Sequence, residues 1–295
     1  MQLKPITAIA VLLLVVASLL LSGCTTSKTP TATSTAQGAQ ATPTAFVFSD
    51  GFENGWSAWT YDSPHRDGQL GHHQTSGPGA ILGATYALES TVVHSGNTAA
   101  KFTLPAVAGA WADVYKTVPY ATTLYMSGWF MFDASIPKGS YLMVGPCICG
   151  YDDHDLANAY IYNDNGVLKW TMEYYTNAAS DKLLVTSSLG PSIQTNVWYN
   201  VQVMSKVGNG NGEVAMWVMQ QGQSQFTEIA RMTGLTNDGD KGPNGEIGAR
   251  HLQVGAWMPA SWLVTQQAFT ATAWYDDTLA STRALTVKEA TTTFA

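Results

Sequence analysis

Short apolar and aromatic runs, interrupted by Gly, Asn, Asp or Pro, follow one another from Phe46 onward. Within many runs apolar and polar residues alternate, and this period of two predicts β-strands with one face in a core. Strand-length segments separated by turns are typical of an all-β sandwich, and helices are expected to be scarce. The clearest predicted strands are Leu124–Phe132, Tyr141–Val144, Ala159–Tyr162, Val167–Tyr175, Val197–Val207, Glu213–Met219, His251–Trp257 and Phe269–Leu279.

The pairing of strands in one predicted hairpin divides its side chains between a core face and an opposite face. The turn Asn163–Gly166 contains Asn-Gly, a strong hairpin signal because both residues tolerate positive φ. We expect Tyr162 to pair with Val167 and Tyr160 with Lys169. The core face then carries Ala159, Ile161, Leu168, Trp170, Met172 and Tyr174. The opposite face carries Tyr160, Tyr162, Lys169, Thr171, Glu173 and Tyr175. Rings beside hydrogen-bonding groups suit a carbohydrate-binding sheet, and a solvated face with ordinary β-forming tyrosines is the alternative.

A second candidate surface lies on the later strand pair. Alternation with the apolar Val201 and Val203 leaves Asn200 and Gln202 on the outer face, and Trp217 is expected to join them from the following strand. These side chains would offer a ring and two amides to a sugar. A purely structural role for each is the competing interpretation.

Composition and charge exclude several classes of function. Hydrophobic residues make up 45% of the 295 residues and charged residues only 12%, which provides a core and argues against disorder. The 14 Lys and Arg against 21 Asp and Glu give a net charge of −7. Without a cationic field, binding to nucleic acid or another polyanion is not expected.

The N-terminal residues predict export. Lys4 precedes the apolar run Ile6–Leu21, which is too short to span a membrane comfortably and favours a signal peptide over residues 1–23. Leu21-Ser22-Gly23-Cys24 resembles the lipobox of prokaryotic lipoproteins, which implies cleavage before Cys24 and lipid on its sulfur; an ordinary signal peptide is the alternative. Residues 24–45, rich in Thr and Ala, are expected to be a flexible linker. The domain is therefore expected outside the cytoplasm, tethered to the cell envelope by lipid.

The remaining cysteines lie close together in the expected domain, residues 46–287, which precedes a C-terminal tail, 288–295. In an oxidising compartment Cys147 and Cys149 could form a Cys-x-Cys disulfide or remain buried thiols. A zinc site is the weaker alternative, because structural zinc usually takes four ligands.

Five sequence blocks resemble a known superfamily. They are Phe48–Gly55, Val93–Phe102, Val197–Val203, Glu213–Val218 and Ala273–Thr278. Together they look like the concanavalin A-like jelly rolls of laminin-G-type, lectin and glycanase domains, and the first and last also resemble jelly-roll carbohydrate-binding modules. The resemblance implies a jelly-roll β-sandwich of two antiparallel sheets. Such a fold does not by itself fix an activity.

The same resemblance implies calcium. In many jelly-roll binding modules acidic residues of the first and last strands hold a structural calcium ion, and the matching residues are Asp50, Glu53, Asp276 and Asp277. A divalent cation relieves the repulsion between adjacent carboxylates. The alternative is that these acids accept hydrogen bonds from backbone amides. The acidic loop Asp238–Ile247 lacks two ligands of a calcium loop and is expected to be a solvated turn.

Catalytic signatures are few. Glycoside hydrolysis uses two carboxylates about 5 to 9.5 Å apart, and the acidic pairs two residues apart are Asp153 with Asp155 and Asp238 with Asp240. Both pairs are expected in loops, and the motifs of laminarinase-type enzymes and jelly-roll alginate lyases have no match. His65, His72 and His73 share the predicted loop Ser63–Ala87 and could hold a metal or a base, or simply be solvated.

The leading hypothesis is a lipid-anchored, exported β-sandwich that binds polysaccharide without cleaving it. A polysaccharide lyase on the same scaffold is the first alternative, and it is favoured over a glycoside hydrolase because no acid pair falls on a predicted strand. A protein-binding adhesion domain is the second. Calcium is the one cofactor expected, the lipid is the expected contact with the membrane, and no nucleic acid partner is expected.

Overall fold

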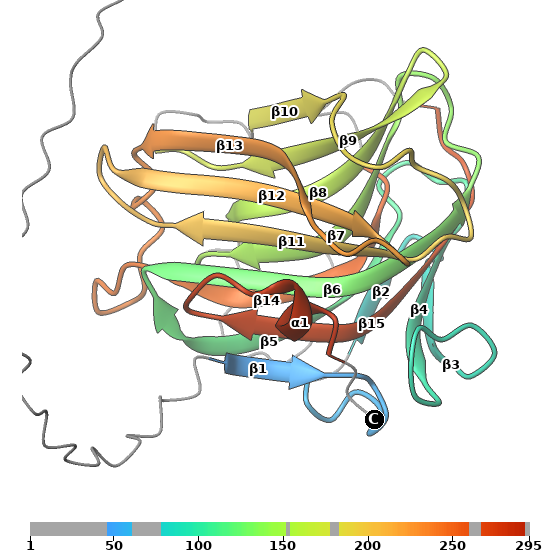
Figure 1. Cartoon of the computed structure of the whole chain (residues 1–295), viewed down its shortest axis with the longest axis horizontal. Helices are drawn as coiled ribbons and strands as arrows, with labels where there is room; N and C mark the ends of the chain where they lie inside the picture. The colour runs from blue at the N-terminus through green and yellow to red at the C-terminus, as the bar shows by residue number, and fades with distance from the viewer. Residues whose placement is uncertain (1–45, 61–77, 152–153, 178–182, 260–266, 293–295) are drawn as a thin grey trace, which may run out of the picture. The chain divides into compact units, whose positions relative to one another are not determined.

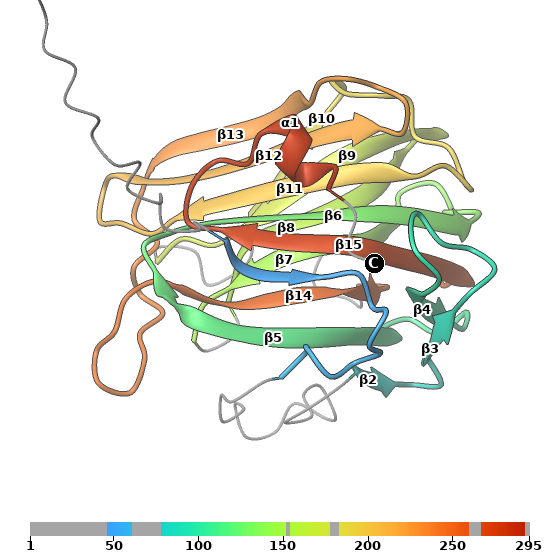
Figure 2. The ribbon, with the colours of Figure 1, turned by 60° about the horizontal axis from the view of Figure 1, so that its bottom comes forward.

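Two antiparallel sheets form the fold (Figures 1 and 2). The computed structural model describes residues 46–60, 78–151, 154–177, 183–259 and 267–292. These residues contain fifteen strands and one helix of four residues, all within one compact unit. The architecture is the jelly-roll β-sandwich that the alternation and the resemblance predict.

The eight-stranded sheet has the order β13-β12-β11-β6-β15-β4-β3, with β1 also paired with β15. Its strands are β13 Thr227–Leu235, β12 Gly212–Gln220, β11 Tyr199–Lys206, β6 Thr123–Ala134, β15 Ala271–Ser281, β4 Ala99–Leu104, β3 Thr85–Glu89 and β1 Phe46–Asp50. One part of β15 pairs with β4 and the following part with β1. The first and last strands therefore lie side by side (Figure 2).

The seven-stranded sheet has the order β10-β9-β8-β7-β14-β5-β2. Its strands are β10 Leu183–Ser187, β9 Val167–Tyr174, β8 Asp155–Asp164, β7 Tyr141–Cys149, β14 Ala249–Trp257, β5 Trp111–Ala121 and β2 Pro78–Ile81. Strand β14 lies between β5 and β7, which come more than 100 residues earlier in the chain. This long-range pairing fixes which side chains are neighbours on the sheet.

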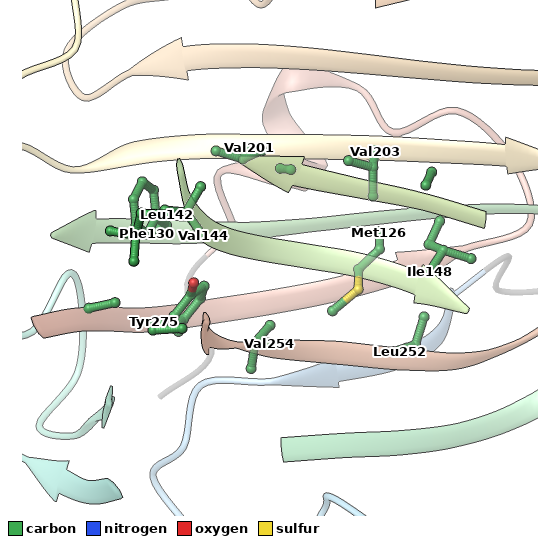
Figure 3. Packing of buried hydrophobic residues seen from close by; sticks show 14 of the residues in the cluster. Met126, Phe130, Leu142, Val144, Ile148, Val201, Val203, Leu252, Val254 and Tyr275 are labelled. Atoms are coloured by element: carbon green, nitrogen blue, oxygen red, sulfur yellow. The ribbon is translucent and has the colours of Figure 1, made fainter. Parts of the chain in front are cut away.

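The core lies between the two sheets (Figure 3). Val201 and Val203 of β11 belong to the same buried cluster as Leu142 and Val144 of β7, and all four are fully buried. Burying one such side chain stabilises the fold by about 1.5 to 3 kcal/mol. The alternating apolar positions of both sheets thus explain why the sandwich closes.

All eight predicted strands are present, with shifted ends. Tyr141–Val144 continues to Cys149, and Ala159–Tyr162 begins earlier, at Asp155. The prediction that Asp155 lies in a loop is therefore wrong. The predicted loop Ser63–Ala87 contains β2 and the first part of β3. The clearest predicted strands also did not include β1, β4, β5, β10 and β13.

The hairpin between β8 and β9 confirms the turn and corrects the register. Asn165 and Gly166 have φ of 54° and 104°, as a two-residue turn requires. Asp164 pairs with Val167, Tyr162 with Lys169 and Tyr160 with Thr171. The predicted register is thus wrong by two residues. Because side chains alternate with a period of two, the predicted faces are still right.

The C-terminal helix α1, Val287–Ala290, spans the expected boundary between domain and tail. Thr286 accepts a hydrogen bond from the backbone of Glu289, whose side chain accepts one from the backbone of Thr286, and this reciprocal capping stabilises the short helix. Ala290 is buried in a cluster with Leu279 and Leu285. The first residues of the expected tail therefore pack on the sandwich. The described residues include no helix long and apolar enough to cross a membrane.

Candidate functional site

The seven-stranded sheet turns polar side chains away from the core, and we call this side the polar face. Register places residues of adjacent strands in rows across it. One row reads Tyr115, Gln253, Cys147, Asn158, Glu173, and another reads Trp111, Trp257, Met143, Tyr160, Thr171. The apolar residues that alternate with them lie in the core. The polar face thus gathers functional groups from five strands.

Tyr160 and Glu173 lie near the centre of this face. They are diagonal neighbours on β8 and β9, and both are fully buried. Burial, followed by the negative charges of Glu173 and Asp155, raises the pKa of Tyr160 well above its usual value. Its hydroxyl is therefore a neutral phenol at physiological pH. We expected these residues to be accessible, and the structure instead buries them on the predicted face.

A sulfur and carboxylate cluster adjoins that centre. Cys147 and Cys149 point to the same side of β7, with their Sγ atoms 3.1 Å apart, and no disulfide joins them. Both thiols donate to Oδ1 of Asp155, at 3.3 Å from Cys147 and 3.7 Å from Cys149. Burial is the main cause that raises the pKa of Cys147 well above its usual value. The thiol of Cys147 is therefore protonated at neutral pH.

A second buried carboxylate lies on β5. Asp113 accepts a hydrogen bond from the Trp111 indole at 2.5 Å, and its same oxygen accepts one from the side-chain amide of Gln253. Two donors on one oxygen hold the carboxylate in a fixed position on the polar face. His251 lies on the same face of β14, buried and paired with Cys149.

Aromatic side chains at two ends of the polar face are less buried. Tyr141 and Tyr162 stack with their ring centres 4.3 Å apart and their planes 20° apart, and both are half-buried. Lys169 forms an ion pair with Asp164 at 2.5 Å beside them. Rings of this kind can stack on the C–H face of a sugar.

Tyr175 lies just beyond β9, at another end. Its ring is 4.3 Å from that of His154, whose Nδ1 is 3.2 Å from Oδ2 of Asp240. Tyr175 also packs partly against the core. Asp240 is buried, so the prediction that its loop is a solvated turn is wrong at this residue.

The second predicted surface is not part of the polar face. Asn200, Gln202 and Trp217 lie on β11 and β12 of the other sheet. Asn200 is fully buried, since its Oδ1 accepts from Ser127 at 2.6 Å and its Nδ2 donates to the Ala290 carbonyl at 2.7 Å. The prediction that Asn200 is exposed to ligand is wrong, because C-terminal residues around Ala290 cover its side chain.

The other two residues of that surface have their own surroundings. Gln202 is also buried, which corrects the same prediction. Trp217 is half-buried between Tyr125, with ring centres 6.3 Å apart, and the guanidinium of Arg231, 5.2 Å from its ring. A ring covered by an aromatic neighbour and a cation is explained by packing alone.

The four acids matched to calcium ligands accept different hydrogen bonds. Asp50 accepts from the Trp59 indole at 2.6 Å. Glu53 accepts from the backbone amides of Asn97 and Thr98, at 2.6 and 3.0 Å. The bonds of Glu53 are those of the alternative interpretation, in which the acids accept hydrogen bonds from backbone amides, whereas the Trp59 donor to Asp50 is a side chain.

Asp276 and Asp277 meet the turn that contains His94 and Ser95. Asp276 Oδ2 accepts from both backbone amides, at 2.9 and 3.1 Å, while Asp277 contacts His94 Nδ1 at 2.8 Å and Ser95 Oγ at 2.9 Å. Burial, and then repulsion from Asp277, raises the pKa of Asp276 to about 7. The charge of Asp277 also acts on Glu53, so Glu53, Asp276 and Asp277 share one region.

Several candidates fall outside the described residues: Cys24, His65, His72, His73 and Asp153. Other polar-face residues were missed by the sequence analysis, although the same alternation contains them. Asn158 lies two residues before Tyr160, and His251 and Gln253 alternate with Leu252 and Val254. Extending the alternation through each strand would have found these three.

Comparison with known proteins gives a fold and no family. No family model and no curated protein matches the chain. It is similar to the solved endo-β-1,4-glucuronan lyase of the fungus Trichoderma reesei, at 18% identity and a TM-score of 0.53, over 81% of this chain and 96% of that one. That likeness shows a shared fold.

Two further solved structures are more distant. A cellulose-induced protein has 17% identity and a TM-score of 0.47, over 81% of this chain and 99% of the other. A mutant alginate lyase in complex with an alginate tetrasaccharide has 13% identity and a TM-score of 0.48, over 63% and 82%. The function must therefore be argued from the site.

Proposed function

We propose that the polar face binds a polysaccharide. The observation that carries the proposal is the half-buried Tyr141–Tyr162 stack beside Lys169, next to a centre rich in hydrogen-bonding groups. Sugar rings need flat apolar surface for their C–H faces and polar groups for their hydroxyls. Asn158 supports this, because its buried Oδ1 has no hydrogen-bond partner among the described residues.

Calorimetry with neutral and uronic acid polysaccharides tests the proposal. Tyr162→Ala is expected to weaken binding about tenfold, since one stacking contact contributes on the order of 1 kcal/mol. Tyr86→Ala, which removes an exposed tyrosine from β3 of the other sheet, is the matched control. Binding that is absent from the whole panel, or equally weakened by both variants, would contradict the proposal.

Cleavage by β-elimination is the second candidate. It requires a base that removes the proton next to a uronate carboxyl group and an acid that protonates the leaving oxygen. Tyr160 has a neutral phenol of the kind the acid requires, and Glu173 and His251 have groups of the kind the base requires. All three are fully buried, so cleavage requires the polar face to open to the substrate. The glucuronan lyase with a similar fold makes the same chemistry worth testing.

The assay for cleavage is the ultraviolet absorbance of the unsaturated sugar that elimination leaves. Tyr160→Phe is expected to abolish the signal while polysaccharide still binds. If the wild type releases no such product from any uronic acid polymer, binding alone remains as the function.

Calcium at Glu53, Asp276 and Asp277 is a further part of the proposal. The raised pKa of Asp276 supports it, because a divalent cation would stabilise the buried carboxylate of Asp276 and offset its repulsion with Asp277. Asp50, occupied by Trp59, is left out. Millimolar calcium is expected to raise Tm and chelator to lower it. Unchanged Tm and no calcium by elemental analysis would leave these acids as hydrogen-bond acceptors of turns.

Export with a lipid on Cys24 completes the proposal. It is supported by the apolar run Ile6–Leu21 and by the small residues before Cys24. Two acyl chains would make the anchor stable where one would be marginal.

A further inference from the structure

Three metal-binding side chains converge on the polar face, beside the proposed carbohydrate site. They are Cys147, Cys149 and Asp155, all buried, and their ligand atoms lie within 4.8 Å of one another. The two sulfurs belong to residues i and i+2 of β7, which places them on one side of the strand. Cys149 pairs with Asp155 at the start of β8, where the register shifts. Local strand geometry therefore creates the cluster.

The distances are close to those of a tetrahedral site. With Zn–S near 2.3 Å and Zn–O near 2.0 Å, a tetrahedron needs about 3.8 Å between sulfurs and about 3.5 Å between sulfur and oxygen. The observed sulfur to oxygen distances are 3.3 and 3.7 Å, and the two sulfurs are 3.1 Å apart. Only the sulfurs need to separate, by roughly 0.7 Å, to accept the ion.

The electrostatics favour a cation at this point. Three acidic groups lie together in the interior, and Glu173 is a fourth acidic group nearby. Bringing such groups together in a protein interior is unfavourable unless they are protonated or paired with a cation. A divalent ion would let both thiols ionise, because a coordinating thiol loses its proton.

We propose that Cys147, Cys149 and Asp155 bind one thiophilic divalent metal ion, with zinc as the probe. Thiolates select zinc and similar metals over calcium or magnesium, which prefer oxygen ligands. His251 of β14 is the candidate for a fourth ligand, because it pairs directly with Cys149 of β7 and lies on the same face of the sheet. The site does not depend on the proposed polysaccharide function, so each can fail alone.

The experiment loads the intact purified protein, in a reductant that is not a thiol, with Zn²⁺ or Co²⁺. We expect one equivalent of zinc by elemental analysis after buffer exchange. Cobalt bound to thiolate gives a ligand-to-metal charge-transfer band in the near ultraviolet, which requires no variant. Cys147→Ser and Cys149→Ser are expected to remove that band and to weaken zinc binding about 100-fold or more.

Met143→Leu is the matched control, because it changes a buried sulfur on the same face of β7 and leaves the three ligands intact. It is expected to bind zinc like the wild type. The proposal is overturned if the wild type shows no charge-transfer band and no bound zinc. It is also overturned if the mass of the protein as isolated is two hydrogens lower and reduction does not create a zinc site, because Cys147 and Cys149 would then be a structural disulfide.

Discussion

Asp276 allows a quantitative test of the electrostatics where the first and last strands meet. It is fully buried beside Asp277, and burial followed by this repulsion raises its pKa from 3.8 to about 7, although backbone amides of His94 and Ser95 donate to it. In the unfolded chain the carboxyl group returns to its ordinary pKa. Between roughly pH 4 and pH 7 the folded protein therefore holds a proton that the unfolded chain does not.

The sign of the effect follows. Unfolding releases this proton, so the free energy of unfolding falls as pH rises, and the stabilisation present below pH 4 is lost above about pH 7. One pKa unit corresponds to about 1.4 kcal/mol. The shift from 3.8 to about 7 thus gives an upper limit of about 4 kcal/mol, or on the order of 10 °C in Tm for a domain of this size.

Urea unfolding followed by tryptophan fluorescence at pH 5 and pH 8 measures the effect, in chelator so that no bound cation contributes. Asp277→Asn removes the repulsion and should make the loss of stability at pH 8 smaller than in the wild type. Asp133→Asn, at an exposed carboxylate near the end of β6, should leave the loss unchanged. An equal loss in the wild type and Asp277→Asn would refute the assigned cause.

Three further outcomes are expected. Tyr160→Ala should lower the free energy of unfolding by about 3 to 5 kcal/mol in urea titrations, because it empties a fully buried site; an unchanged midpoint would mean that the residue is accessible. Asn200→Ala should cost about 1 to 3 kcal/mol, because Ser127 and the Ala290 carbonyl lose their partner, and should leave polysaccharide affinity unchanged. Cys24→Ser should move the protein from the detergent phase to the aqueous phase or leave it unprocessed; unchanged partitioning and mass would exclude the lipid.

Alternation predicted the two faces of the hairpin correctly, because the face of a side chain depends only on whether its position in the strand is odd or even. Ile161 and Trp170 lie in the core, and Tyr160 and Glu173 on the other side, although the register is shifted by two residues. Among the strands that were not predicted, β3 carries a weak signal. In β3 four of five residues are exposed, so no buried face marks the segment.

The order of strands within each sheet could not be predicted from the sequence. For this reason most residues of the site could not be recognised as neighbours. Gln253 contacts Asp113 only because β14 pairs with β5, 140 positions away in sequence. A search for acids two residues apart likewise cannot bring together Asp155 and Glu173, which come from neighbouring strands and both act on Tyr160. Long-range pairing, which no local pattern encodes, determines both sets.

The outer sides of the two sheets illustrate how burial separates structural from functional polar groups. Asn200 is buried, but hydrogen bonds to Ser127 and Ala290 satisfy its amide, so packing explains it fully. On the polar face Asp155 and Glu173 are buried near the same phenol and thiol, and each raises the pKa of both. Burying acidic groups together costs stability unless they are protonated or paired with a cation. Sequences keep such costly groups chiefly where they bind or react, which is why the polar face is the site to test first.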